Sequence, residues 1–157
     1  MSPDTPLDRA WIAQRIPHQG SMCLLDAVQQ WSDDAITCSA HIAPGTEHPL
    51  RRDGVLSSAH AIEYAAQAMA VHGALTAGDS PAPAAGYLAS VRAVQLHHSE
   101  LLAEDSPLQI TAQRLSAVGA NVMYGFRVAS ARGCLAEGRA AVVLDVGANA
   151  GASGGDA

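Results

Sequence analysis

The spacing of apolar side chains predicts one long helix near the middle of the chain. Residues 57–77 contain no proline and are almost entirely apolar. Ser57 or Ser58 can cap the start of this stretch, and two glycines, Gly73 and Gly78, lie toward its end. Because apolar residues occupy nearly every side rather than a single stripe, we expect the helix to be buried on more than one side.

Alternating apolar and polar residues predict strands on both sides of this helix. Before the helix, two short apolar stretches between Ala27 and Ile42 flank the polar sequence Ser32-Asp33-Asp34, which is typical of a hairpin turn. After it come four strand-like stretches, at residues 86–97, 108–117, 121–130 and 134–146. The order indicates an α+β domain in which an antiparallel sheet wraps around one helix.

The chain length and the composition of its ends indicate one domain. A chain of 157 residues can bury a single core. We place that domain at residues 1–146 and a flexible tail at 147–157, because the tail contains only Gly, Ala, Ser, Asn and one Asp. Near the other end, Pro6 to Gln14 is expected to form a short helix that ends before Pro17.

Composition and charge exclude several classes of function. Alanine accounts for 32 residues, there is a single Phe, and the net charge of −6 argues against nucleic-acid binding and, more weakly, against anionic membranes. No apolar run is long enough to cross a bilayer and no secretory signal is visible, so we expect a cytoplasmic protein. Cys23, Cys38 and Cys134 lack the spacing of a zinc or redox motif and are expected to be small buried apolar residues, with no metal bound.

Two segments resemble the 3-hydroxyacyl-[acyl-carrier-protein] dehydratases of the hotdog fold. Residues 16–28, IPHQGSMCLLDAV, are similar to the start of that family's domain, and residues 62–70, IEYAAQAMA, are similar to its central helix. The resemblance extends over about residues 7–146 and is closest to the divergent subgroup that accompanies polyketide-type and aryl-polyene pigment assembly. It implies a hotdog fold and dehydration of a 3-hydroxyacyl thioester to a 2-enoyl thioester.

The resemblance also implies a catalytic pair across a dimer interface. Glu63 and Gln67 match the family's helix motif and lie one helical turn apart. In the loop before the helix, His48 is fifteen positions ahead of Glu63, close to the family's separation, although the surrounding loop lacks the family's Phe and Met-Pro-Gly. His48 is therefore the candidate base and Glu63 the candidate acid.

Three further residues are candidates for contact with the substrate. Gln67 is expected to orient the reacting groups, and the backbone amide of Gly86 is the resemblance's candidate for stabilising the enolate oxygen. His60 lies on the same helical face as Glu63, so it is an alternative to His48 as the base.

The partners implied by the resemblance are an acyl carrier protein or coenzyme A, either of which carries the substrate on a phosphopantetheine arm. No other cofactor is expected, and Arg51, Arg52 and Arg92 are candidates for meeting an acidic carrier. Because a curled sheet leaves open edges, we expect a homodimer, with a heterodimer as the alternative. Two other functions remain open: a hotdog thioesterase in which Glu63 activates water, and a catalytically degenerate subunit that pairs with an active dehydratase.

Overall fold

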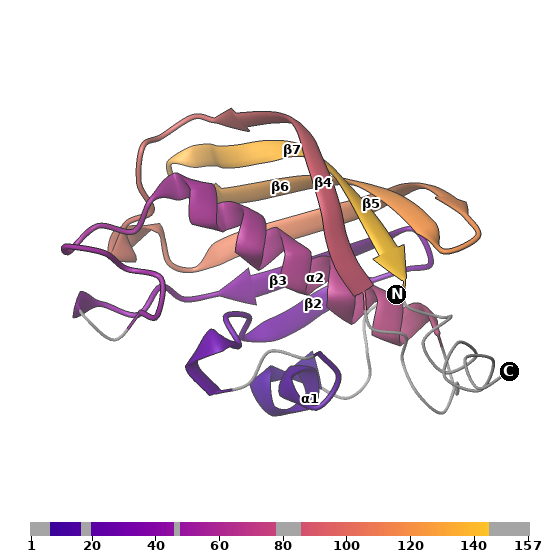
Figure 1. Cartoon of the computed structure of the whole chain (residues 1–157). Coiled ribbons are helices and arrows are strands. Elements are labelled where there is room, and N and C mark those ends of the chain that lie inside the picture. Colours follow the sequence, from indigo (N-terminus) through magenta and orange to yellow (C-terminus); the bar gives the residue numbers. More distant parts are fainter. Residues whose placement is uncertain (1–6, 17–19, 46–47, 78–85, 145–157) are drawn as a thin grey trace, which may run out of the picture.

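The protein folds as one antiparallel sheet curved around one long helix (Figure 1). The computed structural model describes residues 7–16, 20–45, 48–77 and 86–144. The strands of the described residues are β1 (Leu7–Asp8), β2 (Ala27–Trp31), β3 (Ala35–Ala40), β4 (Gly86–Leu96), β5 (Leu108–Val118), β6 (Asn121–Ser130) and β7 (Gly133–Leu144). They lie in the order β1-β2-β3-β5-β6-β7-β4, so β4, which follows the long helix in sequence, forms one edge of the sheet.

The helices agree with the sequence pattern, with one difference at the start of the long helix. The predicted helix at 57–77 is a 3₁₀ turn, η3 (Ser58–His60), followed by α2 (Ala61–Thr76), and the Ser57 hydroxyl caps the turn by accepting from the Ala59 N–H. The other helical segments are α1 (Arg9–Ala13), η1 (Gly20–Met22) and η4 (Ala103–Asp105). The α+β prediction is thus confirmed, whereas β1 was missed because a strand of two residues carries no alternation. The predicted tail at 147–157 lies outside the described residues.

The helix α2 lies against the concave face of the sheet and is buried on several sides, as predicted. Its buried residues are Ala61, Tyr64, Ala65, Gln67, Ala68, Met69, Val71 and His72. The facing side of β6 contributes Val122, Tyr124, Phe126 and Val128, which alternate with more exposed neighbours. Because alanine side chains are short, the sheet approaches the helix closely, and the larger Tyr64 and Phe126 fill the remaining space.

The prediction that all three cysteines are buried is wrong for one of them. Cys23 and Cys38 are buried, and burial raises the pKa of the Cys38 thiol to about 12. Cys134 is only half-buried, because it is the second residue of β7 and lies at the rim of the sheet.

The segment that follows β4 braces the start of α2. Ser58 N–H donates to the Ser99 carbonyl at 3.1 Å, and Leu101 N–H donates to the Leu56 carbonyl at 2.8 Å. Both bonds join the start of the helix to the same segment, residues 99–101, between β4 and β5.

A buried carboxylate lies further along that segment. Asp105 accepts two hydrogen bonds from Arg132, at 2.7 and 2.8 Å. These guanidinium bonds hold the pKa of Asp105 down at about 2.

Candidate functional site

Glu63 lies in the first turn of α2, half-buried on an otherwise apolar helix. The turn η3 precedes this helix end, and two backbone hydrogen bonds between residues 56–58 and residues 99–101 fix the direction in which it points. Local structure therefore presents one carboxyl group at a defined place beside the core.

Gln67 joins Glu63 to the segment that precedes β2. Its side chain is fully buried, and its Oε1 accepts from the Leu24 N–H at 2.9 Å. Its Nε2 donates to the Met22 carbonyl at 2.7 Å and to Glu63 Oε1 at 3.3 Å. Both amide N–H groups are thus used within the chain, so the geometry assigns Gln67 to positioning Glu63.

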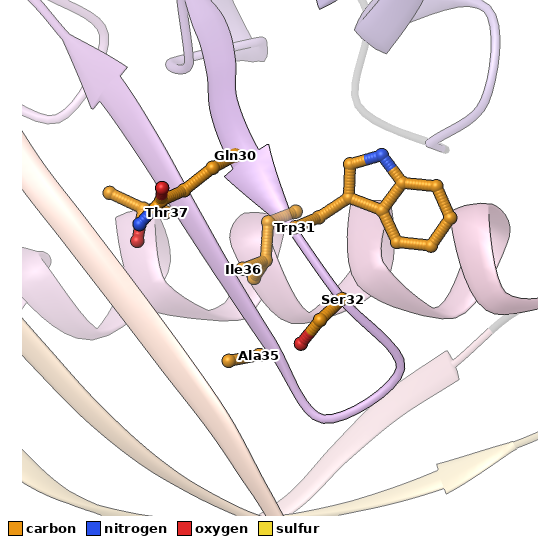
Figure 2. Close-up of a pocket in the computed structure, with 6 residues that line it drawn as sticks. All are labelled: Gln30, Trp31, Ser32, Ala35, Ile36 and Thr37. Carbon is orange, nitrogen blue, oxygen red and sulfur yellow. The ribbon is translucent and has the colours of Figure 1, made fainter. Parts of the chain in front are cut away.

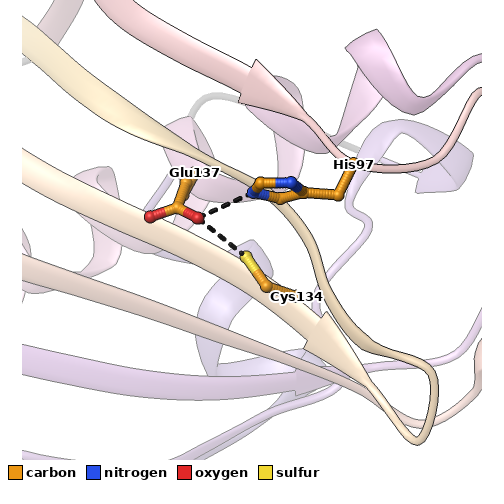
Figure 3. A group of neighbouring side chains, drawn as sticks. All are labelled: His97, Cys134 and Glu137. Atoms are coloured by element: carbon orange, nitrogen blue, oxygen red, sulfur yellow. Dashed lines mark hydrogen bonds and ion pairs between the residues drawn. The ribbon is translucent and has the colours of Figure 1, made fainter.

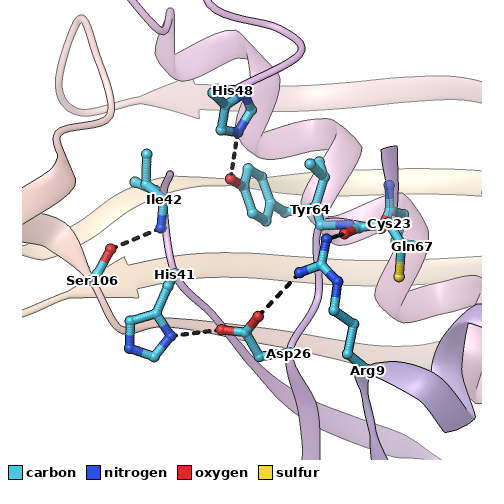
Figure 4. Close-up of polar contacts among 10 residues, drawn as sticks. Arg9, Cys23, Asp26, His41, Ile42, His48, Tyr64, Gln67 and Ser106 are labelled. Carbon is cyan, nitrogen blue, oxygen red and sulfur yellow. Dashed lines mark hydrogen bonds and ion pairs between the residues drawn. The ribbon is translucent and has the colours of Figure 1, made fainter. Parts of the chain in front are cut away.

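His48 is buried, and both of its ring nitrogens are hydrogen-bonded within the chain; Figure 4 shows the bond to Tyr64. Its Nδ1 accepts from the Leu50 N–H at 3.1 Å, so the ring proton of the neutral imidazole is on Nε2. That Nε2–H donates to the Tyr64 hydroxyl at 2.8 Å. Burial lowers the pKa of His48, and the positive charges of Arg51 and His60 lower it further.

Within one chain the structure joins Glu63 to Gln67 and joins His48 to Tyr64. His60 is half-buried at the helix start, one turn before Glu63, and Gly86 opens β4 opposite Leu144. Sequence reasoning gave no role to Tyr64, whose hydroxyl is the partner of His48. The available signal was a tyrosine inside a predicted buried helix, since a buried phenol needs a hydrogen-bond partner.

A second polar network lies beside this site, where α1 meets the start of β2 and the end of β3 (Figure 4). Asp26 accepts from Arg9 at 3.4 Å and is bonded to His41 Nδ1 at 2.6 Å, and Arg9 also donates to the Cys23 carbonyl. Arg51, which was a candidate for contact with a carrier protein, is half-buried and donates to the Ala43 carbonyl at 2.8 Å. That prediction is corrected for Arg51, whose side chain braces its own loop.

The opposite end of α2 contains a similar His–Tyr pair and a separate cavity. His72 is buried, donates from Nε2 to the Ser32 carbonyl at 2.8 Å, and accepts at Nδ1 from the Tyr124 hydroxyl at 2.7 Å. The cavity, of about 210 Å³, lies at the β2–β3 hairpin (Figure 2). Its lining residues are Gln30, Trp31, Ser32, Ala35, Ile36 and Thr37. None of the predicted site residues lines it.

A curved antiparallel sheet wrapped around one long helix is the architecture of the hotdog class. The family model of the ApeP-like proteins, described as ApeP dehydratase, matches residues 10–149. The chain therefore belongs to the ApeP-like dehydratase family and is a dehydratase, a hydro-lyase. Both the predicted hotdog fold and the resemblance to divergent hotdog dehydratases are confirmed.

Solved structures share the fold of this chain. The dehydratase heterocomplex ApeI:P from Xenorhabdus doucetiae matches with a TM-score of 0.74 and 25% sequence identity, over 85% of this chain and 90% of that one. AziG from S. sahachiroi shares the fold at a TM-score of 0.57 and 14% identity, over 76% of this chain and 90% of that one. A hypothetical thioesterase with coenzyme A from Streptococcus pneumoniae TIGR4 shares the fold at a TM-score of 0.54 and 10% identity, over 74% of this chain and 83% of that one.

The remaining comparisons add two findings. No curated protein sequence matches this chain. Among the described residues, no helix combines the length and the apolar character needed to cross a membrane.

Proposed function

We propose that this dehydratase removes water from a 3-hydroxyacyl thioester carried on the phosphopantetheine arm of an acyl carrier protein, giving a 2-enoyl thioester. The observation that supports this proposal best is the position of Glu63. Its carboxyl group lies at the start of a largely apolar helix and accepts a hydrogen bond from the buried Gln67. The second amide N–H of Gln67 donates to the Met22 carbonyl, so neither N–H is available to a substrate. A fixed carboxyl group in apolar surroundings suits proton transfer to a leaving hydroxyl.

The proposed reaction needs one base, one acid and one donor to the thioester oxygen. The base takes the proton alpha to the carbonyl, and the electron pair of that C–H bond forms the new double bond. The acid, Glu63, gives its proton to the 3-hydroxyl group, which leaves as water with the electrons of the C–O bond. The backbone N–H of Gly86 is the proposed donor to the enolate oxygen. No cofactor beyond the substrate's own phosphopantetheine arm is required.

Two arrangements can supply the base. In the first, His48 faces Glu63 of a second copy of this chain and exchanges its bond to Tyr64 for the substrate. In the second, a different dehydratase subunit supplies the imidazole. The hydrogen bond from the Leu50 N–H to His48 Nδ1 favours the second, because it leaves Nε2 protonated and unable to accept another proton. The dehydratase heterocomplex is consistent with this arrangement.

We propose that the dimer forms along β4. This strand lies at the edge of the sheet and exposes the large apolar side chains Leu88, Val91 and Leu96. An unpaired edge with apolar side chains is suited to pairing with a second sheet.

Arg52 and Arg92 are both exposed and remain the proposed contacts for an acidic carrier protein. All three cysteines are free thiols, which agrees with the reducing cytoplasm as the proposed compartment.

The test uses a synthetic 3-hydroxyacyl carrier-protein substrate and follows the acyl group by mass spectrometry together with the release of free thiol. We expect loss of water without thiol release. Glu63→Gln should lower the rate by about 10²–10⁴-fold, the usual contribution of an acid–base group. Glu104→Gln, at an exposed glutamate in η4, is the matched control and should leave the rate unchanged.

The possible outcomes separate the alternatives. Thiol release in place of water loss would reject dehydration and favour a thioesterase. Water loss that begins only when a second dehydratase subunit is added would establish the heterodimeric arrangement. Unchanged turnover in Glu63→Gln would remove Glu63 from the mechanism.

A further inference from the structure

Three side chains with metal-binding atoms converge at the end of β4, apart from the site described above. His97 follows β4, while Cys134 and Glu137 belong to β7 (Figure 3). His97 Nε2 lies 2.8 Å from Glu137 Oε2, and Cys134 Sγ lies 3.5 Å from the same oxygen. All three atoms are within 4.8 Å of one another. An imidazole, a thiol and a carboxylate thus point to one place.

Backbone hydrogen bonds hold this cluster beside an irregularity of the sheet. The His97 N–H donates to the Leu135 carbonyl at 2.9 Å, just beyond the pair of Leu96 and Ala136. The register between β6 and β7 shifts where Val128 pairs with Ala136 and Ala129 pairs with Cys134, and Leu135 and Ala136 are both buried. This bulge lets Cys134 and Glu137 approach each other, and His97, in the bend after β4, reaches the same carboxylate.

We propose that His97, Cys134 and Glu137 form a binding site for a divalent zinc ion. Zinc prefers nitrogen and sulfur donors, and it accepts carboxylate oxygen as well. At ordinary zinc–ligand lengths, neighbouring donors of a tetrahedral site are about 3.3–3.6 Å apart. The sulfur–oxygen distance of 3.5 Å already meets this value, and the nitrogen–oxygen distance of 2.8 Å needs only a small expansion.

The exposure of the cluster leaves a fourth coordination position for water. The side chains of His97 and Glu137 are 40% and 44% exposed, so an ion can enter from solvent. Three protein ligands and one water molecule are a common zinc arrangement. The bound ion would join the end of the edge strand β4 to β7 by coordination as well as by backbone hydrogen bonds.

One positively charged side chain lies beside the cluster. Arg127 is paired with Glu137 across β6 and β7, so its positive charge opposes a bound cation. Removing that charge should therefore strengthen ion binding.

The test is titration of the reduced full-length protein with Co²⁺ and with Zn²⁺. Cobalt reports a thiolate ligand directly through a charge-transfer absorption, and Zn²⁺ should raise Tm. We expect one thiolate-bound Co²⁺ per chain. Cys134→Ser should abolish that absorption and weaken Zn²⁺ binding by at least about tenfold, since loss of even an outer partner of a metal site has such an effect. Arg127→Gln should strengthen binding.

The control uses a second His–carboxylate pair among the described residues. His41 and Asp26 lie 2.6 Å apart without a sulfur atom, so His41→Ala should leave the cobalt absorption unchanged. The proposal is overturned if no thiolate absorption develops, or if Cys134→Ser retains it. It is also overturned if His97→Ala binds Zn²⁺ as tightly as the unaltered protein. Tm measured without metal shows whether each variant is folded.

Discussion

Replacing Gln67 by leucine tests whether one buried amide both stabilises the fold and positions Glu63. The side chain is fully buried and bonds to the Leu24 N–H and the Met22 carbonyl, and it also donates to Glu63. Leucine has a similar volume and no polar atom. The substitution therefore keeps the packing but leaves one backbone donor, one backbone acceptor and one carboxylate oxygen without this partner.

The expected loss follows from those contacts. A buried polar group that loses its partner costs about 1–3 kcal/mol, so two backbone groups predict a loss of roughly 2–6 kcal/mol in the free energy of unfolding. Since domains are usually stable by about 5–15 kcal/mol, the variant should remain folded over most of this range. The lost bond to Glu63, worth about 1 kcal/mol, should lower kcat about fivefold to tenfold with a smaller change in KM.

Urea unfolding measures the first effect, and dehydration of the carrier-linked substrate measures the second. Gln109→Leu is the matched control, because Gln109 is an exposed residue of β5 and should change stability by less than about 0.5 kcal/mol. A Gln67→Leu variant as stable as the control would refute the role of the buried amide. Full stability loss with unchanged kcat would limit Gln67 to a structural role.

Two further predictions concern buried polar groups elsewhere. The pKa of Asp105 is lowered from 3.8 to about 2, so its ionised form contributes roughly 2 kcal/mol of stability above about pH 4, which is lost as pH falls toward 2. Urea unfolding from pH 2 to 7 should show this loss in the unaltered protein and not in Asp105→Asn, whereas Asp34→Asn, at an 80% exposed side chain, should behave like the unaltered protein. Tyr64→Phe and Tyr124→Phe each remove the hydroxyl partner of a buried histidine, so both should lower stability by about 1–3 kcal/mol. Tyr64→Phe acts on His48, so a dehydration rate that falls in Tyr64→Phe and not in Tyr124→Phe would make His48 the base, whereas equal rates would favour a base from a second subunit.

The elements of the fold could be predicted because each has a local signal. Alternation along residues 121–130 matches β6, and the polar turn at residues 32–34 separates β2 from β3. The helix was predicted from a proline-free apolar stretch, and Glu63 with Gln67 from their spacing on it. These signals are local because backbone conformation and side-chain periodicity depend on neighbouring residues.

The partners of the site residues were decided only by tertiary structure. Nothing local to His48 shows that the Leu50 N–H directs its proton toward Tyr64, since that bond depends on how the loop folds onto the helix. The cluster at His97 was missed for the same reason: its histidine and its cysteine are far apart in the chain, without the spacing of a metal motif, until β4 pairs with β7. Hydrogen bonds and metal ligands require contact in space, and a sequence determines such contacts only through the complete fold.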